Sequence, residues 1–433
     1  MPSFRNSAKR SGVPVPRALG SVSWTLDPAR IPALVRALQP EAIFEDPRGE
    51  RLYGVGACVV LEARVEPSAL VDQAHALLEQ VEVGGEPPRI LGGFAFDPGR
   101  PADGLWTGFP AGRLVLPELL ISDRGYAVAV TEQADRPRRD ALRLLLDATS
   151  APEGARASCV RVQPADPREA WRTAVAAALQ CIGSGALQKV VMARPLALEL
   201  DRPLHSAGLV EALGELHPDC FRFAFRHGGK LFGGATPELL FRRQGTQLQT
   251  MALAGTARRD PDPSRDQALG TELLADEKEQ REHLLVTDAL RQALGPLATA
   301  IQVDGPVLRR LANVQHLQTT VRAQLAPGVT DRALLDRLHP TPAVCGAPRE
   351  RARTLLRELE GFDRGWYAGP VGVIGRDGAT FAVALRCLLA EGTRARLFVG
   401  AGLVAGSDAD REWRETETKS LAVLRALGHD GAP

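Results

Sequence analysis

The chain has 433 residues, with 53 Lys or Arg against 52 Asp or Glu, and 44% of its residues are hydrophobic. This length suits one large domain or two ordinary ones, and the apolar fraction can fill a sizeable core. The charge balance excludes an overall bias toward nucleic acid or an anionic membrane, and no run of about 18 apolar residues predicts a transmembrane helix.

The N-terminus is basic, and no acid precedes Asp27. It lacks the apolar segment of a secretory signal, so we expect residues 1–20 to form a disordered basic tail, although the composition also fits a transit peptide. The six cysteines are scattered without a CxxC pair or metal-ligand spacing, as is typical of thiols in a reducing compartment. We therefore expect a cytoplasmic protein whose folded region, of one large domain or two ordinary ones, covers residues 21–433.

The first part of this folded region, residues 21–150, has a mixed α/β pattern. Helical spacing of apolar residues predicts helices at 34–44 and 68–81, and alternating or apolar runs predict strands at 51–63, 89–98, 113–122 and 126–132. Its glycines and aromatic residues are typical of closely packed strands. We find no pattern in this region that indicates chemistry.

Residues 151–166 are rich in Pro, Gly and Ala and predict a connection, which ends in the helix-starting pair Asp166-Pro167. A helix follows from residue 168 and stops at the glycines 183 and 185. The next strand, residues 187–194, is apolar except for Lys189. That lysine either lies at an exposed edge of a sheet or on an inner face, where loss of water favours the neutral amine and makes it a base.

Next, Glu238 follows a Gly-Gly turn and a proline, and Thr256 follows a short apolar run. A long helix is predicted from Asp266 to Leu294, with Glu279 and Glu282 three residues apart on one face. Such a pair is usually a solvated helix surface, but it also suits a shared divalent cation.

The C-terminal part predicts a strand bearing His316, a tight loop after His339, a helix at 349–362 and a hairpin turning at residues 377–378. Either histidine taken alone is more typical of a structural role. Arg386 interrupts an apolar strand, which indicates pairing with an internal acid or bidentate binding of a carboxylate.

A last strand at 397–399 leads into Gly402, where a ligand could lie against the backbone, and then into a helix capped by Asp408. Glu412 and Glu415 form a second acidic pair at spacing three on that helix. Two such pairs of hard oxygen ligands favour Mg²⁺ or Ca²⁺ over zinc. Since Mg²⁺ completes its coordination with water and substrate oxygens, the pattern predicts a site for an anionic substrate.

Seven ordered segments, spread over residues 165–427, resemble the chorismate-utilising enzymes, which include isochorismate synthases, salicylate synthases and the large subunit of anthranilate synthase. The segments are KVVMAR, GGATPELL, LAGTARR, DEKEQREHLLV, HPTPAVCGAP, YAGPVGVIG and GAGLVAGSDADREWRETETK. The resemblance implies a large single α+β domain, with antiparallel sheets packed face to face and helices outside. Residues 21–150 then correspond to the family's variable first part. A monomer without a glutamine amidotransferase subunit is also implied.

The resemblance also assigns roles to individual residues. The implied cofactor is Mg²⁺, held by Glu282 and Glu415, with Glu279 and Glu412 as supporting carboxylates. The implied substrate is chorismate, a dicarboxylate. Its pocket would include Thr256, His316, Ala343, Tyr367, Arg386, Gly402 and Lys419.

Two positions indicate a reaction within the family. Members that add ammonia carry glutamine where this chain has Lys189, so lysine implies water as the nucleophile. Members that eliminate pyruvate tend to carry a hydroxyl residue at the position of Ala343. Both positions imply an isomerase of the isochorismate synthase type, in which Lys189 is the base and Glu238 the acid. One alternative is a salicylate synthase. A second alternative is a catalytically inactive regulator that binds chorismate or metal. The product could feed siderophore, menaquinone or salicylate synthesis.

Overall fold

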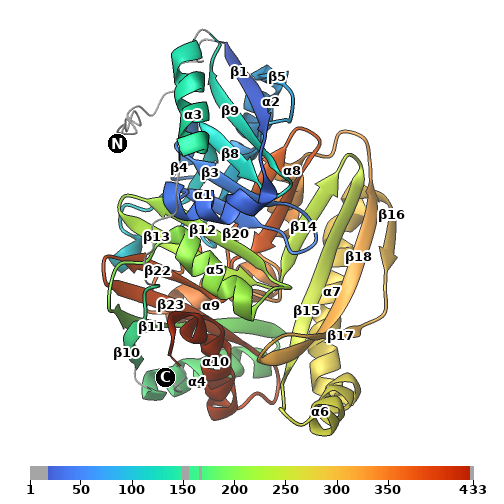
Figure 1. The fold of residues 1–433 in the computed structure, drawn as a ribbon. Coiled ribbons are helices and arrows are strands. Elements are labelled where there is room, and N and C mark those ends of the chain that lie inside the picture. Colours follow the sequence, from blue (N-terminus) through green and yellow to red (C-terminus); the bar gives the residue numbers. More distant parts are fainter. Residues whose placement is uncertain (1–17, 134, 149–155, 165–167, 430–433) are drawn as a thin grey trace.

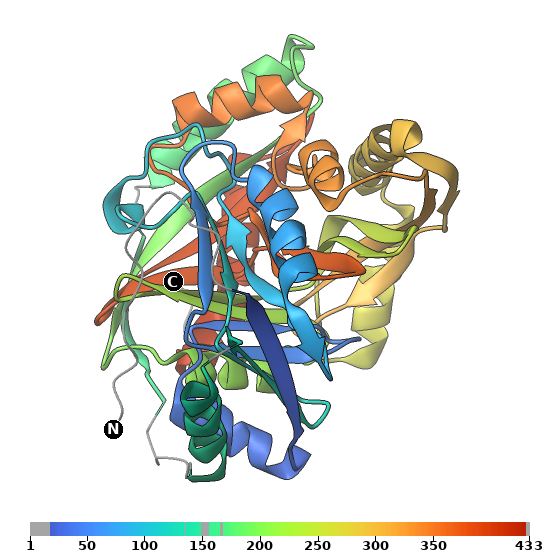
Figure 2. The ribbon, with the colours of Figure 1, turned by 90° about the horizontal axis from the view of Figure 1, so that it is seen from above.

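The computed structural model describes residues 18–133, 135–148, 156–164 and 168–429. In this part of the chain, two large β-sheets occupy the middle and most helices lie around them (Figure 1, Figure 2). The described strands pair antiparallel, except for β1 and β5, which are parallel. The predicted α+β class, with antiparallel sheets and outer helices, is confirmed.

The first sheet has thirteen strands, and a long pair near one of its edges, β11–β23, carries part of the site. The pair β11–β23 runs antiparallel from Val190 opposite Leu403 to Glu199 opposite Arg394, which places the start of β11 beside the glycines of β23. The strand order is β10 (Cys159–Pro164), β11 (Lys189–Leu200), β23 (Arg394–Leu403), β22 (Cys387–Glu391), β13 (Lys230–Thr236), β12 (Phe221–His227), β2 (Ala42–Glu45), β3 (Arg51–Val55), β8 (Leu119–Ser122), β9 (Tyr126–Glu132), β1 (Leu19–Thr25) and β5 (Glu82–Gly84), with β19 (Gly346–Ala347) beside β11.

The second sheet has ten strands, and its longest pair, β15–β18, contains a bulge. The register shifts at Gly255, whose φ of +79° is a conformation that favours glycine, and this shift sets Thr256 opposite His316. The strand order is β16 (Ala298–Val303), β18 (Val314–Leu325), β15 (Gln247–Arg258), β14 (Leu239–Gln244), β21 (Gly378–Val383), β20 (Pro370–Gly375), β6 (Ile90–Phe94), β7 (Gly112–Leu116) and β4 (Val59–Ala63), with β17 (Val307–Arg310) beside β18.

Helices α7 and α10 carry the two acidic pairs, and each begins at an aspartate. The side chain of Asp276 accepts hydrogen bonds from the first amides of α7, and that of Asp408 accepts one from Arg411 N in α10. Helices α10 and α4 lie side by side (Figure 1). The helices are α1 (Ile31–Leu38), α2 (Ala69–Gln80), α3 (Arg136–Ala148), α4 (Arg168–Gly183), α5 (Ser206–Leu216), α6 (Pro263–Ala275), α7 (Glu277–Leu294), α8 (Asp331–Leu338), α9 (Arg349–Leu359) and α10 (Ala409–Leu424).

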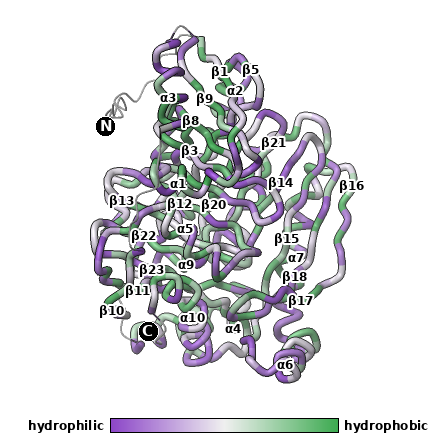
Figure 3. Tube along the Cα trace, in the orientation of Figure 1, coloured by the Kyte–Doolittle hydropathy of each residue, from purple (hydrophilic) through white to green (hydrophobic). Residues whose placement is uncertain are grey.

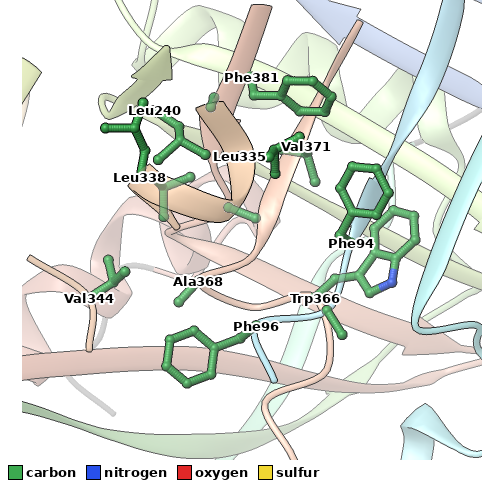
Figure 4. Close-up of a cluster of buried hydrophobic side chains, with 14 of the residues drawn as sticks. Phe94, Phe96, Leu240, Leu335, Leu338, Val344, Trp366, Ala368, Val371 and Phe381 are labelled. Atoms are coloured by element: carbon green, nitrogen blue, oxygen red, sulfur yellow. The ribbon is translucent and has the colours of Figure 1, made fainter. Parts of the chain in front are cut away.

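The main hydrophobic core joins the two sheets. Phe223 and Phe232 of the first sheet belong to the same buried cluster as Phe94 and Phe381 of the second. Hydrophobic segments gather among the central strands (Figure 3), and the close-up shows Phe94, Phe381 and Trp366 near α8 (Figure 4). Burial of this apolar surface from both sheets holds them face to face, as predicted.

Several predicted boundaries were wrong. The helix predicted from Asp266 to Leu294 is two helices, because Asp276 is extended (ψ 113°) and caps α7. The helix predicted at 34–44 ends at Leu38, where the left-handed Gln39 precedes a proline, and its last residues form β2.

Other boundaries shifted near the parts of the chain that the structure leaves undescribed. The connection predicted at 151–166 contains strand β10, and the tail predicted over 1–20 overlaps β1, which begins at Leu19. The helix start predicted at Asp166-Pro167 lies outside the described residues. Across the described ranges, none of the helices has the length and apolar character needed to span a membrane.

The chain passes from one sheet to the other through very short segments. Only residues 237 and 238 separate β13 of the first sheet from β14 of the second, and residues 384–386 separate β21 of the second from β22 of the first. These crossings place Glu238 and Arg386 at the boundary between the sheets.

Candidate active site

One cavity brings together every site residue predicted from the sequence. Its walls come from β11 and β23 of the first sheet, β15 and β18 of the second, the two crossings, and helices α7 and α10. The predicted residues that line it are Lys189, Glu238, Thr256, Glu279, Glu282, His316, Ala343, Tyr367, Arg386, Gly402, Glu412, Glu415 and Lys419.

Lys189 begins β11 and points inward; only 1% of the residue is exposed. Its Nζ lies 2.8 Å from Glu282 Oε1 on α7, so the lysine joins the first sheet to the helix. Gly402 on the neighbouring strand makes room for this pair. A Cβ on Gly402 would lie 2.8 Å from Glu282 Oε1 and 3.2 Å from Lys189 Cε. The glycine is therefore required for close packing of the ion pair against the backbone.

Glu238 is almost fully buried, 3% exposed, at the crossing from β13 to β14. Burial raises its pKa to about 7, although the positive charges of Lys189, Lys419 and Arg386 act in the opposite direction. A carboxyl group with this pKa is protonated in a large fraction of molecules near neutral pH. Glu238 can therefore donate a proton to a bound molecule.

Arg386 is oriented by a histidine. Its Nη2 lies 3.0 Å from His316 Nε2, and the other ring nitrogen, Nδ1, lies 3.2 Å from Gly255 O and 3.1 Å from Thr256 Oγ1. Burial and the charge of Arg386 hold the pKa of His316 well below its usual value, so the ring is neutral. Because a guanidinium only donates, Nε2 must accept and Nδ1 must carry the proton.

The backbone of Arg386 is in the left-handed region, with φ +48°, which is uncommon for a residue with a side chain. Ala368, next to Tyr367, has φ +61°. Such conformations persist where the surrounding structure enforces them, and they concentrate at functional sites. Here they accompany a buried guanidinium and a buried phenol that line the same cavity.

Lys419 on α10 reaches β23. Its Nζ lies 2.7 Å from Glu415 Oε1 and donates to Gly400 O at 3.1 Å. A Cβ on Gly400 would lie 2.8 Å from the hydroxyl of Tyr367, so glycine is needed there for the phenol to approach the strand. The lysine therefore holds the acidic helix over the glycine strand.

The four predicted metal carboxylates line the same cavity, where the charges of Glu282 and Glu415 add to burial in raising the pKa of the other two. The pKa of Glu412 is raised to about 7, mainly by burial and secondly by the charge of Glu415. The pKa of Glu279 is also raised, mainly by burial and secondly by the charge of Glu282. As placed, each carboxylate contacts a lysine or an arginine. Within the described ranges, no three acidic, histidine or cysteine side chains are grouped closely enough to form a complete metal site.

The donor set nevertheless fits a hard cation. Glu412 Oε1 is buried and has no hydrogen-bond partner among the described residues; its nearest cation is Lys278 Nζ, at 3.6 Å. A buried carboxylate oxygen without a hydrogen bond is costly, and a divalent cation bound by carboxylates and water would satisfy it.

Sequence reasoning missed two cationic residues of the cavity, Lys278 and Arg411. Lys278 Nζ lies 3.8 Å from Glu279 Oε1, and Arg411 Nη2 lies 3.7 Å from the same oxygen. Each of them directly precedes a predicted acidic residue in the sequence, at 279 or 412, and this adjacency could have indicated them. His339 does not line the cavity: its ring packs on Phe96 and its Nε2 donates one long hydrogen bond to Phe96 O, which agrees with a structural role.

Comparison with known proteins agrees with this geometry. The family model for chorismate binding enzymes matches residues 19–428. The chain is 38% identical over 383 residues to a salicylate biosynthesis isochorismate synthase of Pseudomonas aeruginosa, covering 85% of this chain and 79% of that protein. It is 34% identical over 361 residues to the isochorismate synthase MenF of Bacillus subtilis, covering 79% and 75%. The solved structure of the menaquinone-specific isochorismate synthase MenF of Escherichia coli superposes with a TM-score of 0.80 at 30% identity, covering 95% of each chain. The chain therefore belongs to the family of chorismate binding enzymes.

Proposed function

We propose that this protein is an isochorismate synthase that isomerises chorismate to isochorismate with Mg²⁺ as cofactor. The observation that carries the proposal is a buried lysine and a buried glutamic acid of raised pKa that face one cavity. Lys189 and Glu238 are 1% and 3% exposed, and the pKa of Glu238 is raised to about 7. The relatives named for this activity support the same reaction.

The reaction needs a base and an acid at the same time. In its neutral form, Lys189 would take a proton from the water that attacks C2 of the ring, while Glu238 protonates the hydroxyl that leaves C4 as the double bond shifts. One water is consumed and one is released, so the net change is an isomerisation. Positioned acid–base groups of this kind contribute about 10²–10⁴ in rate.

The remaining cavity residues would bind and orient the substrate. With Glu238 protonated and Lys189 neutral, the remaining charged residues of the cavity lining are four cations and four carboxylates. A dicarboxylate together with a divalent cation adds no net charge to this balance. Arg386, with its guanidinium fixed by His316, is suited to bidentate binding of one carboxylate, and Tyr367 lies nearby as a hydroxyl donor.

Glu282 and Glu415 would hold the Mg²⁺, and Glu279 and Glu412 would support it through water. When bound, the ion neutralises and orients a substrate carboxylate. Ala343 also lines the cavity and adds no hydroxyl to it. This supports a reaction that stops at isochorismate without elimination of pyruvate.

The experiment is to incubate the purified protein with chorismate, with and without Mg²⁺, and to separate the products by chromatography. Isochorismate in equilibrium with chorismate, formed only with the metal, is the expected result. Salicylate with pyruvate would overturn the assignment in favour of a salicylate synthase. Metal-dependent binding of chorismate without turnover would indicate a regulator.

A further inference from the structure

Strand β11, which carries Lys189, has a gap along one of its edges. On that side, β19 pairs with Lys189 and Val190, and β10 pairs only from Leu196 onward. Between them, no strand of the described chain covers residues 191–195. Buried backbone groups in such a gap need other partners, since leaving them unpaired is costly.

One backbone contact and two side chains fill this gap, and the backbone contact is the 2.9 Å hydrogen bond from Val191 N to Cys345 O. Arg364 Nη2 donates to Val191 O at 2.6 Å, and Ala193 N donates to Glu360 Oε1 at 2.7 Å. The two side chains also pair with each other, Arg364 Nε to Glu360 Oε2 at 2.8 Å. Pro195, the next residue facing the gap, has no N–H to satisfy. The ion pair therefore takes the place of a missing strand.

Arg364 also reaches two other parts of the cavity wall, one through its side chain and one through its backbone. Arg364 Nη1 donates to Val344 O at 2.9 Å, next to Ala343, and Tyr367 N donates to Arg364 O at 3.0 Å. Val191, Val344 and Tyr367 all line the cavity. Side chains two residues apart on a strand share a face, so a shift at Val191 moves Lys189 in the cavity as well.

Both side chains of this ion pair are buried, so their contacts are held in one geometry. The side chains of Glu360 and Arg364 are 2% and 3% exposed, and the guanidinium stacks on Phe96, with Cζ 4.4 Å from the ring centre. A buried ion pair contributes little net stability compared with apolar residues of similar size. Its planar fork, in contrast, fixes two carbonyl groups from separate segments at set positions.

We infer that Glu360 and Arg364 are positioning residues that set the location of Lys189 relative to the loop of Ala343 and to Tyr367. This inference rests on the proposed function, because it assigns the pair to the placement of the proposed base. Neither residue lines the cavity, so their effect on the reaction passes through the backbone of β11.

The test compares two double variants that each remove a buried ion pair without leaving an unpaired charge. Glu360→Leu with Arg364→Met removes the positioning pair together with the hydrogen bonds that its side chains make to β11. Glu45→Leu with Arg222→Met removes a pair of similar burial, with side chains 8% and 3% exposed, that does not line the cavity. For the first, we expect kcat for chorismate conversion to fall by about 10- to 100-fold with KM changed by less than about threefold, as for a displacement of about 1 Å. The second should keep the kcat of the unmodified protein.

Amide hydrogen exchange provides a readout that does not depend on turnover: exchange at Ala193 should accelerate only in the first double variant. If that variant fails to fold, Arg364→Lys keeps the charge and loses the fork, and its kcat should still fall. Unchanged kcat in a folded variant, or an equal loss in the control, would overturn the inference. Failure of the unmodified protein to convert chorismate would instead overturn the proposed function.

Discussion

Replacing Glu238 with Gln should lower activity and raise stability, and the two effects have the same origin. Burial raises the pKa of this carboxyl from 4.5 to about 7 in the folded protein, so the folded state binds more protons than the unfolded state between these values. Its contribution to stability is fully present below pH 4.5, declines as the pH rises and is lost above about pH 7. The difference of 2.5 pKa units corresponds to about 3 kcal/mol of destabilisation once the group is ionised.

Glutamine has nearly the same shape as the protonated acid and never ionises. Urea unfolding of Glu238→Gln and of the unmodified protein should therefore give a difference in free energy of unfolding that is small at pH 4.5 and grows to about 3 kcal/mol in favour of the variant at pH 8.5. In the chromatographic assay, turnover of the variant should fall by about 10²–10⁴. The activity of the unmodified protein should fall above about pH 7, and this fall should be absent from the residual activity of the variant.

Asp363→Asn is the matched control. Burial raises the pKa of Asp363 to about 6, it does not line the cavity, and an amide oxygen can still accept the hydrogen bond from Gly365 N. This variant should show a similar but smaller gain in stability at high pH and retain turnover. A stability difference for Glu238→Gln that does not change with pH would refute the buried-acid reasoning. Full activity in that variant would refute its role as the acid.

Three further predictions address the rest of the site. Lys189→Ala should lose about 10²–10⁴ of turnover, and near-full activity would show that the base lies elsewhere. Gly402→Ala, whose Cβ would lie 2.8 Å from Glu282 Oε1, should lower kcat by about 10- to 100-fold. The control Gly183→Ala places its Cβ in open space and should leave kcat unchanged. Equal kcat values for the two variants would contradict the close packing of the ion pair against Gly402. Chelation of divalent metal should abolish conversion of chorismate and added Mg²⁺ should restore it, while activity that survives exhaustive chelation would contradict the cofactor assignment.

Much of the site could be predicted because its residues belong to local segments with distinctive neighbours. Glu282 and Glu415 each lie three residues after another glutamate in a predicted helix, and Lys189 interrupts an apolar strand. These signals lie within a few residues and need no knowledge of tertiary contacts. The residues so predicted meet in one cavity, while their individual roles remain predictions.

Other features depend on contacts between distant segments. The break between α6 and α7 comes from one extended residue, Asp276, inside a pattern with continuous helical spacing. Glu360 and Arg364 lie four residues apart around the end of a helix, a spacing that is typical of an exposed ion pair on a helix surface. Only the gap on β11, which arises when the strands assemble, shows why they are buried. No local pattern contains that information.

The short crossings between the sheets have a consequence for how the length of this chain can vary. Two residues link β13 to β14 and three link β21 to β22, and both links carry a proposed site residue. Adding or removing one residue in either link would change the separation of Glu238 and Arg386 and would disturb both sheets. The hairpin tip at Gly228 and Gly229 is exposed and meets no neighbouring atoms within 4 Å, so it is suited to accept an inserted peptide or a reporter domain. Natural length variants of this enzyme should therefore differ at such tips and keep the two crossings constant.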